Sequence, residues 1–396
     1  MNSPRLIFTC MVSASLLVAC GGQGEPETLS KGSFTAVVSF GDSLSDIGSY
    51  APATSLSGTG APPYFGGKFT TNETSDGSPD ANALGKIWVE NLASSLGIAL
   101  TPAEVGFNGV STKCPAAVVP ALAASCTAYG QGGARVTDPH GIGHNADGTG
   151  ALTVPVVTQV ANHLARFSSF RRSDLILVFA GNNDVFIQLD GFAATAAQIQ
   201  TQLAAGTLSV AQANAQLAAA QQSAEGVVRT AAQELVVDVK GQILAKGGIY
   251  VAVVNLGDIG DTPFASTLPA PVRTVVTDLV QVFNAALKAG LADQPVRTID
   301  AFTLLKVVSA DPARYGFVNN TIPACDPAKI SALTAGAVAD GSSLFCNATP
   351  GAPYNTLRTG ADTTTWQFAD DVHPTTGGHK AISDTFAAQL KSFGWI

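Results

Sequence analysis

The chain has 396 residues, of which 46% are hydrophobic and 13% are charged, and its formal net charge is −8. A chain this long and this apolar can bury a large core, which excludes general disorder. An acidic chain without a cluster of lysine or arginine also argues against nucleic acid as a partner.

The first 19 residues predict a secretion signal that is removed from the mature protein. Arg5 precedes an apolar stretch that is too short to span a membrane. The stretch ends in LVAC, which resembles the lipobox of bacterial lipoproteins and implies cleavage before Cys20 and lipidation of its sulfur. We therefore expect an exported protein, anchored to the bacterial outer membrane by a tether over residues 20–33. The alternative is an ordinary secreted protein.

Strands and helices alternate from residue 34 onward. Apolar, β-branched segments predict buried parallel strands over 34–40, 174–180, 248–256 and 296–300. Helices are predicted over 86–96, 156–167, 271–292 and 377–393. This order predicts an α/β fold: one three-layer α/β/α domain over residues 34–396, with a mainly parallel sheet of the flavodoxin-like type.

An Ala/Gln-rich stretch of high helix propensity, residues 193–235, interrupts the alternation. We expect Gly206 to divide it into two helices, which form either an inserted helical hairpin or an extended crossover. Residues 55–80 and 311–366 are rich in loop-forming residues, and ordered loops of that length are often functional.

The predicted domain contains four cysteines: Cys114, Cys126, Cys325 and Cys346. Four cysteines allow three disulfide pairings. We favour the local pairs 114–126 and 325–346, which close two short loops and suit an exported protein. A metal site is the alternative, but the sequence has no C-x-x-C spacing to support it.

Two patterns predict a nucleophile and its base. Ser43 directly follows the first predicted strand in FGDSLSD, and ligands of open α/β sheets bind beyond the carboxyl ends of the strands. Asp370 and His373 are three residues apart, so the carboxylate can fix the tautomer of the imidazole and leave its other nitrogen free as a base. Each pattern alone is also compatible with a turn or a helix cap.

Two further patterns offer donors to an oxyanion. Asn183 follows the strand over 174–180 in FAGNNDVF and carries a side-chain amide. In YGQGGARV, Gly133 can present a backbone N–H because no side chain blocks the approach, and Gly132 is the competing candidate.

The residues of these patterns and their order along the chain resemble the motifs of the GDSL, or SGNH, hydrolase family of esterases and lipases. The resemblance covers about residues 34–395. The resemblance implies that Ser43 is the nucleophile, that His373 is its base and that Asp370 orients His373. It implies an oxyanion hole made by the Ser43 and Gly133 N–H groups and the Asn183 side chain. No metal or organic cofactor is required. 

The chain departs from the usual family residues at Ala128, Gly130 and Gly257, which leaves the local geometry open, chiefly around Gly133.

The resemblance implies a serine esterase or lipase that hydrolyses lipid, short acyl or aryl esters through an acyl-enzyme on Ser43. Alternatives with the same site are a carbohydrate deacetylase and a phospholipase or acyltransferase. The alternative of another class is a catalytically silent surface lipoprotein that binds a partner. We expect a monomer whose partners are the ester substrate and, through the lipid anchor, a membrane.

Other polar residues are expected to be structural. His140 and His144 are four apart, which would suit a metal on a helix, but the glycines around them predict a loop, so no metal site is expected. His163 is expected to be a surface or packing residue, and His379 lacks an aspartate three residues before it. Asp46 is expected to shape a turn or cap a helix.

Overall fold

The computed structural model describes residues 32–56, 64–65, 67–73, 85–350 and 355–396. The predicted signal, the lipidation site Cys20 and nearly all of the predicted tether lie outside these residues, as does much of the loop-rich stretch 55–80. Within the described part of the chain, no helix is long and apolar enough to cross a membrane.

Six parallel strands form the central sheet, in the order β10-β9-β8-β1-β7-β4. The strands are β1 (Ala36–Gly41), β4 (Thr101–Pro102), β7 (Cys126–Ala128), β8 (Asp174–Phe179), β9 (Tyr250–Val254) and β10 (Arg297–Ile299). All four predicted strands are present, and β1 lies between β8 and β7. The edge strand β4 and its neighbour β7 were not predicted, because two or three residues are too few to show a pattern.

Two small antiparallel sheets accompany the central one: β2 (Ser55–Leu56) with β3 (Tyr64–Phe65), and β5 (Glu104–Phe107) with β6 (Val110–Lys113). The helices are α1 (Ala51–Thr54), α2 (Trp88–Ser95), α3 (Val156–Phe167), α4 (Asn182–Ala204), α5 (Val210–Asp238), α6 (Pro263–Thr267), α7 (Ala270–Leu291), α8 (Ala301–Ala310), α9 (Pro327–Leu333) and α10 (Thr376–Ser392). The four predicted helices correspond to α2, α3, α7 and α10.

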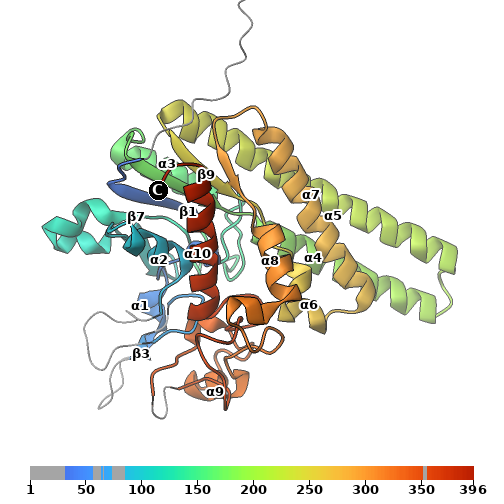
Figure 1. Cartoon of the computed structure of the whole chain (residues 1–396). Helices are drawn as coiled ribbons and strands as arrows, with labels where there is room; N and C mark the ends of the chain where they lie inside the picture. Colours follow the sequence, from blue (N-terminus) through green and yellow to red (C-terminus); the bar gives the residue numbers. More distant parts are fainter. Residues whose placement is uncertain (1–31, 57–63, 66, 74–84, 351–354) are drawn as a thin grey trace, which may run out of the picture.

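Helices cover both faces of the sheet, which gives the three α/β/α layers predicted from the sequence (Figure 1). On one face, Trp88 of α2 and Phe386 of α10 contact Phe179 of β8, with ring centroids 6.4 Å from it. On the other face, His163 of α3 lies 5.9 Å from Phe40 of β1. Phe179 pairs with the residue that follows Phe40, and successive side chains of a strand point to opposite faces. The two aromatic clusters therefore lie on opposite sides of the sheet.

The Ala/Gln-rich stretch forms most of α4 and α5, which lie beside α7 and extend away from the sheet (Figure 1). Gly206 has a φ of +70° and follows the end of α4, so the chain turns where the sequence predicted. The Ser209 hydroxyl then caps α5 by accepting the Gln212 N–H at 3.3 Å. Because α4 follows β8 and α5 leads to β9, the pair is an extended crossover between neighbouring parallel strands.

Among the described residues, two disulfides join Cys114 to Cys126 and Cys325 to Cys346, the local pairing favoured from the sequence. The second bond belongs to a small core of its own that includes Ile330. Part of the loop-rich stretch 311–366 is therefore a packed lobe.

Asp238, at the end of α5, lowers the stability of the folded protein in a way that depends on pH. Its side chain is buried, and Oδ2 has no hydrogen-bond partner in the described structure. Burial raises the pKa of this carboxyl to about 7. An unfolded aspartate ionises near pH 4, so between about pH 4 and pH 7 the folded protein retains a proton that the unfolded chain has lost. Stability therefore falls as the pH rises through this window.

We expect Asp238→Asn to raise the free energy of unfolding by about 2 kcal/mol at pH 8 and to change it little at pH 4. Urea unfolding at both pH values measures the difference. Asp293→Asn, which changes an exposed carboxylate, is the control. An equal effect of Asp238→Asn at both pH values would contradict the argument.

Candidate active site

Ser43, His373 and Asp370 form a continuous row of hydrogen-bonded side chains. Ser43 Oγ lies 2.8 Å from His373 Nε2, although 330 positions separate the two residues. On the other side of the ring, His373 Nδ1 lies 2.8 Å and 2.9 Å from the two carboxylate oxygens of Asp370. An imidazole held in this way can take a proton from the serine at Nε2 while its Nδ1–H faces the carboxylate. The structure thus brings together the three residues predicted to be catalytic.

Asp370 is surrounded by donors. Its Oδ1 accepts the N–H groups of Val372 at 3.0 Å and His373 at 2.7 Å, and its Oδ2 accepts the Ser343 N–H at 2.8 Å. Burial alone would raise the pKa of Asp370, but the charge of His373 and the hydrogen bonds from His373 and Ser343 outweigh burial and hold the pKa well below its ordinary value. The group is therefore a carboxylate at neutral pH.

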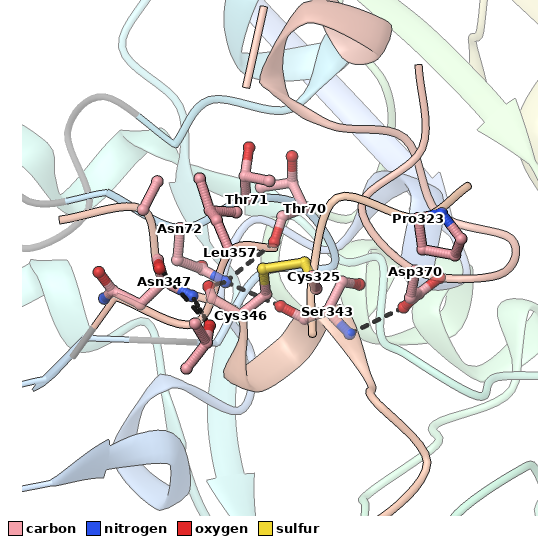
Figure 2. Close-up of a disulfide and its surroundings, with 12 residues drawn as sticks. Thr70, Thr71, Asn72, Pro323, Cys325, Ser343, Cys346, Asn347, Leu357 and Asp370 are labelled. Atoms are coloured by element: carbon pink, nitrogen blue, oxygen red, sulfur yellow. Dashed lines mark hydrogen bonds between the residues drawn. A yellow bond between two sulfur atoms is a disulfide. The ribbon is translucent and has the colours of Figure 1, made fainter. Parts of the chain in front are cut away.

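The Cys325–Cys346 disulfide supports Asp370 through both of its cysteines (Figure 2). Ser343, which donates to Asp370, lies three residues before Cys346, and the Cys325 N–H donates to the carbonyl of the residue before Asp370 at 2.9 Å. The Asn72 side chain adds a link from another loop by donating to the Ser343 and Cys346 carbonyls, at 3.0 Å each. The cysteine spacing predicted the bond but carried no sign of this role.

The turn that carries Ser43 is fixed by polar side chains that no sequence pattern had indicated. Gln159 of α3 accepts the Gly41 N–H at 2.9 Å and donates to the Gly41 carbonyl at 2.8 Å, which holds the end of β1. Asp42 accepts the Asn182 side-chain N–H at 3.0 Å, which joins this turn to the start of α4. Burial raises the pKa of Asp42 to about 6 against the hydrogen bonds it accepts. Ser43 itself begins the 3-10 helix η1 (Ser43–Ser45), directly after β1.

Gly133 is better placed than Gly132 to offer a free N–H. The Gly132 N–H donates to Asp46 Oδ2 at 2.8 Å, whereas the Gly133 N–H donates to no described residue. Gly133 has a φ of +76°, and a Cβ there would lie 2.0 Å from the Ile142 carbonyl oxygen, so only glycine fits. Both glycines line the cavity that contains Ser43.

Asn183 lies in the first turn of α4, which follows β8, the neighbour of β1 on the side away from β7. Its side-chain nitrogen donates to the Ala134 carbonyl at 2.8 Å. A primary amide has two N–H donors, so one remains beyond this bond. The bond also ties Asn183 to the loop that carries Gly133, and both residues line the cavity.

Asp46 shapes a turn, as predicted, and also joins the loop of Ser43 to that of Gly133. Its Oδ1 accepts the N–H groups of Gly48 at 2.9 Å and Ser49 at 2.6 Å. Its Oδ2 accepts the Ser49 hydroxyl at 2.6 Å and the N–H of Gly132, which is 86 positions away. Burial raises the pKa of Asp46, and the bonds from Ser49, Gly132 and Gly48 oppose that rise.

Because Asp46 is buried and bonded to both loops, Asp46→Ala should lower the free energy of unfolding by about 3 kcal/mol. If Gly133 donates to the oxyanion, its displacement should also lower kcat about 100-fold. Ser49→Ala removes one donor and keeps the carboxylate, so both effects should be much smaller. Denaturant titration and steady-state kinetics measure the two quantities. An unchanged kcat in folded Asp46→Ala protein would contradict a role in placing Gly133.

His379 is near the row but is held as a neutral ring. It is fully buried, accepts the Trp88 N–H at Nδ1 at 3.3 Å, and has Nε2 3.2 Å from the Phe69 carbonyl oxygen. Burial lowers the pKa of His379 to about 3. The Phe69 ring lies 4.8 Å from the ring of His373, so His379 helps to hold the aromatic neighbour of that residue.

The other histidines lie away from the row. His163 packs in the core against Phe170, with ring centroids 4.5 Å apart, and burial lowers the pKa of His163 to about 4. His140 and His144 lie in a loop, as predicted, with ring centroids 6.0 Å apart. The described residues contain no group of three side chains that could hold a metal ion.

A cavity of about 660 Å³ opens beside Ser43, at the carboxyl ends of the strands. Its walls are mainly apolar and include the rings of Phe107, Phe186 and Phe264. A volume in this range suits a small-molecule ligand. The row can therefore deliver the serine hydroxyl, with a base beside it, to a ligand bound in an apolar cleft.

Comparison with known proteins identifies the family. The family model of GDSL-like lipases and acylhydrolases matches residues 37–386, from β1 to the middle of α10. The chain belongs to this family. Membership implies hydrolase activity on ester or acyl substrates. No curated protein matches the chain.

One departure of this GDSL hydrolase from its family has a structural reason. At Gly130, a Cβ would lie 2.6 Å from the backbone oxygen of Ser45, so glycine lets the loop after β7 pack closely against η1. The departure therefore favours the close approach of the Gly133 loop to Ser43 rather than disturbing it.

Proposed function

We propose that this GDSL hydrolase is a serine esterase or lipase that cleaves carboxylic esters through an acyl-enzyme on Ser43. The observation that carries the proposal is the hydrogen-bonded row of Ser43, His373 and Asp370 at an apolar cavity.

In the proposed reaction, Ser43 Oγ attacks the ester carbonyl carbon while His373 Nε2 takes the serine proton. The carbonyl oxygen becomes negative and is met by the N–H groups of Ser43 and Gly133 and by the free amide N–H of Asn183. The ester C–O bond breaks, and the alcohol leaves with the proton from His373.

Hydrolysis of the acyl-enzyme repeats these roles with water as the nucleophile. His373 takes a proton from the water, the acid is released and Ser43 recovers its hydrogen. Asp370 stabilises the charged imidazole in both halves of the reaction.

The cavity favours an ester with an alkyl or aryl acyl group over the alternatives. Burying a carbohydrate against apolar walls would strip water from its hydroxyl groups, which disfavours a deacetylase. Among the described residues, the cavity is lined by three carboxylates, Asp340, Asp370 and Asp371, and by no lysine or arginine. A phosphate group would be repelled there, which disfavours a phospholipid substrate.

Labelling with a fluorophosphonate tests the nucleophile, because this reagent needs an activated serine. We expect a stoichiometric adduct on Ser43, located by peptide mass spectrometry, and no adduct on heat-unfolded protein. The same result would exclude the silent binding lipoprotein. Folded protein without an adduct on Ser43 would end the proposal.

We also propose that the enzyme is exported and held to a membrane by lipid on Cys20. The two disulfides support an oxidising compartment, and LVAC at residues 17–20 supports the anchor. Mass spectrometry of the mature N-terminal peptide checks this, and an unmodified N terminus elsewhere would contradict it.

A further inference from the structure

The cavity has an apolar arm between the loop after β9 and helix α8. The arm is lined by Ile259 of the 3-10 helix η6 (Ile259–Asp261), Phe264 of α6, and Leu304, Leu305 and Val308 of α8. Helix α8 follows β10, which is three strands from β1 in the sheet. With strands about 4.8 Å apart, β10 lies roughly 14 Å from the strand that carries Ser43, so this wall of the cavity lies to one side of the serine. We call this part of the cavity the α8 arm.

The walls of the α8 arm are fixed to one another. Lys306 of α8 pairs with Asp258 and, at 3.1 Å, with Asp261, which joins α8 to η6. Asn255, at the end of β9, accepts the Ala301 N–H at the start of α8 at 2.6 Å. The arm is thus a preformed space rather than one that a ligand must open.

Gly257 lies in this arm without a conformational need for glycine. Its φ lies outside the left-handed region, so other residues could adopt its backbone conformation. A Cβ at Gly257 would meet the flexible end of Leu305 at 3.3 Å and the nearest backbone atom, the Ala301 oxygen, at 3.7 Å. A side chain at position 257 would therefore press on Leu305 and reduce the space beside it, whereas glycine leaves Leu305 undisturbed. The residue at position 257, where the chain departs from its family, therefore affects how much space the arm offers.

We propose that the α8 arm receives the acyl chain of the ester, and that Gly257 and Leu305 set the longest chain it accepts. The inference rests on the proposed serine esterase. It names the substrate class as unbranched medium- or long-chain acyl esters. The side of the cavity lined by Asp340 and Asp371 is left for the alcohol.

A series of p-nitrophenyl esters from acetate to dodecanoate tests the arm, because only the acyl chain changes. Each methylene buried in the arm is worth about fourfold in kcat/KM. Gly257→Val should lower kcat/KM for octanoate at least about 30-fold and for acetate by less than about twofold. Leu305→Trp should act in the same direction, and Leu305→Ala should move the optimum to longer chains. Val307→Trp, on the solvent-exposed side of α8, is the matched control and should leave the profile unchanged.

The outcomes separate the arm from the chemistry. An unchanged chain-length profile in folded Gly257→Val and Leu305→Trp would overturn the proposal that the α8 arm receives the acyl chain. A wild-type enzyme that hydrolyses the acetate ester as fast as the octanoate ester would overturn it too. Failure of the proposed function would appear differently, as no ester hydrolysis by the wild type or full activity of Ser43→Ala. Thermal unfolding checks each variant. If Gly257→Val does not fold, Leu305→Ala tests the arm by enlarging it.

Discussion

Replacing Ser43 by alanine should lower kcat for a p-nitrophenyl ester about 10⁵- to 10⁶-fold and leave the fold intact. The proposed reaction forms its covalent bond at Ser43 Oγ, and no other hydroxyl or thiol in the described structure lies against His373 Nε2. The change removes one hydrogen bond at the edge of an open cavity, so the free energy of unfolding should change by about 1 kcal/mol or less. Steady-state kinetics and thermal unfolding measure the two effects.

Ser45→Ala is the matched control for the loss of the Ser43 hydroxyl. Ser45 lies in the same 3-10 helix, is buried, and has no hydrogen-bond partner for its Oγ among the described residues. Its kcat should stay near that of the wild type. Activity of Ser43→Ala within about tenfold of the wild type would show that another group is the nucleophile.

The sequence predicted those parts of the fold whose patterns are local and long. Strands β1, β8 and β9 are buried on both faces, so each appears as a continuous apolar segment. Helices such as α3 are amphipathic over several turns. Strand β7 was not predicted because its three residues are too few to form a recognisable pattern. It is buried because it lies beside β1 in the sheet.

The site residues could be predicted for a different reason, since their identities and order carried the resemblance to the family. The hydrogen bonds that hold these residues in place could not be predicted in this way. The bond from Asp46 to Gly132 spans 86 positions, and the bond from Ser343 to Asp370 spans 27. Both depend on how loops are placed by the finished sheet and by a disulfide, which no local pattern encodes.

Packing of the last helix explains how the two ends of the chain meet. Trp88 of α2 lies 5.1 Å from Phe386 of α10, and both contact Phe179 at the end of β8. This cluster holds α10 against the sheet, with its N-terminal end at the carboxyl ends of the strands. The loop before α10, which carries His373, therefore reaches Ser43.

Asp370→Asn should lower kcat about 10⁴-fold, because an amide can no longer hold His373 in the required tautomer. In the wild type, both carboxylate oxygens accept: Oδ1 from Val372 and His373, and Oδ2 from Ser343. An asparagine has one acceptor oxygen, so its NH₂ group must face an N–H donor. Kinetics at neutral pH measure the loss. Asp384→Asn, on an exposed carboxylate of α10, is the control and should keep wild-type kcat.

The same substitution should affect stability in a way that depends on pH. The folded-state pKa of Asp370 lies below its unfolded value, so the carboxylate contributes stability that is present above about pH 4 and is lost as the pH falls through the folded pKa. Asp370→Asn should therefore destabilise the protein at pH 7 and do so less and less below about pH 4. Urea unfolding across this range measures the effect. A kcat within about tenfold of the wild type, or a destabilisation that grows as the pH falls, would show that Asp370 is not the buried carboxylate on which His373 depends.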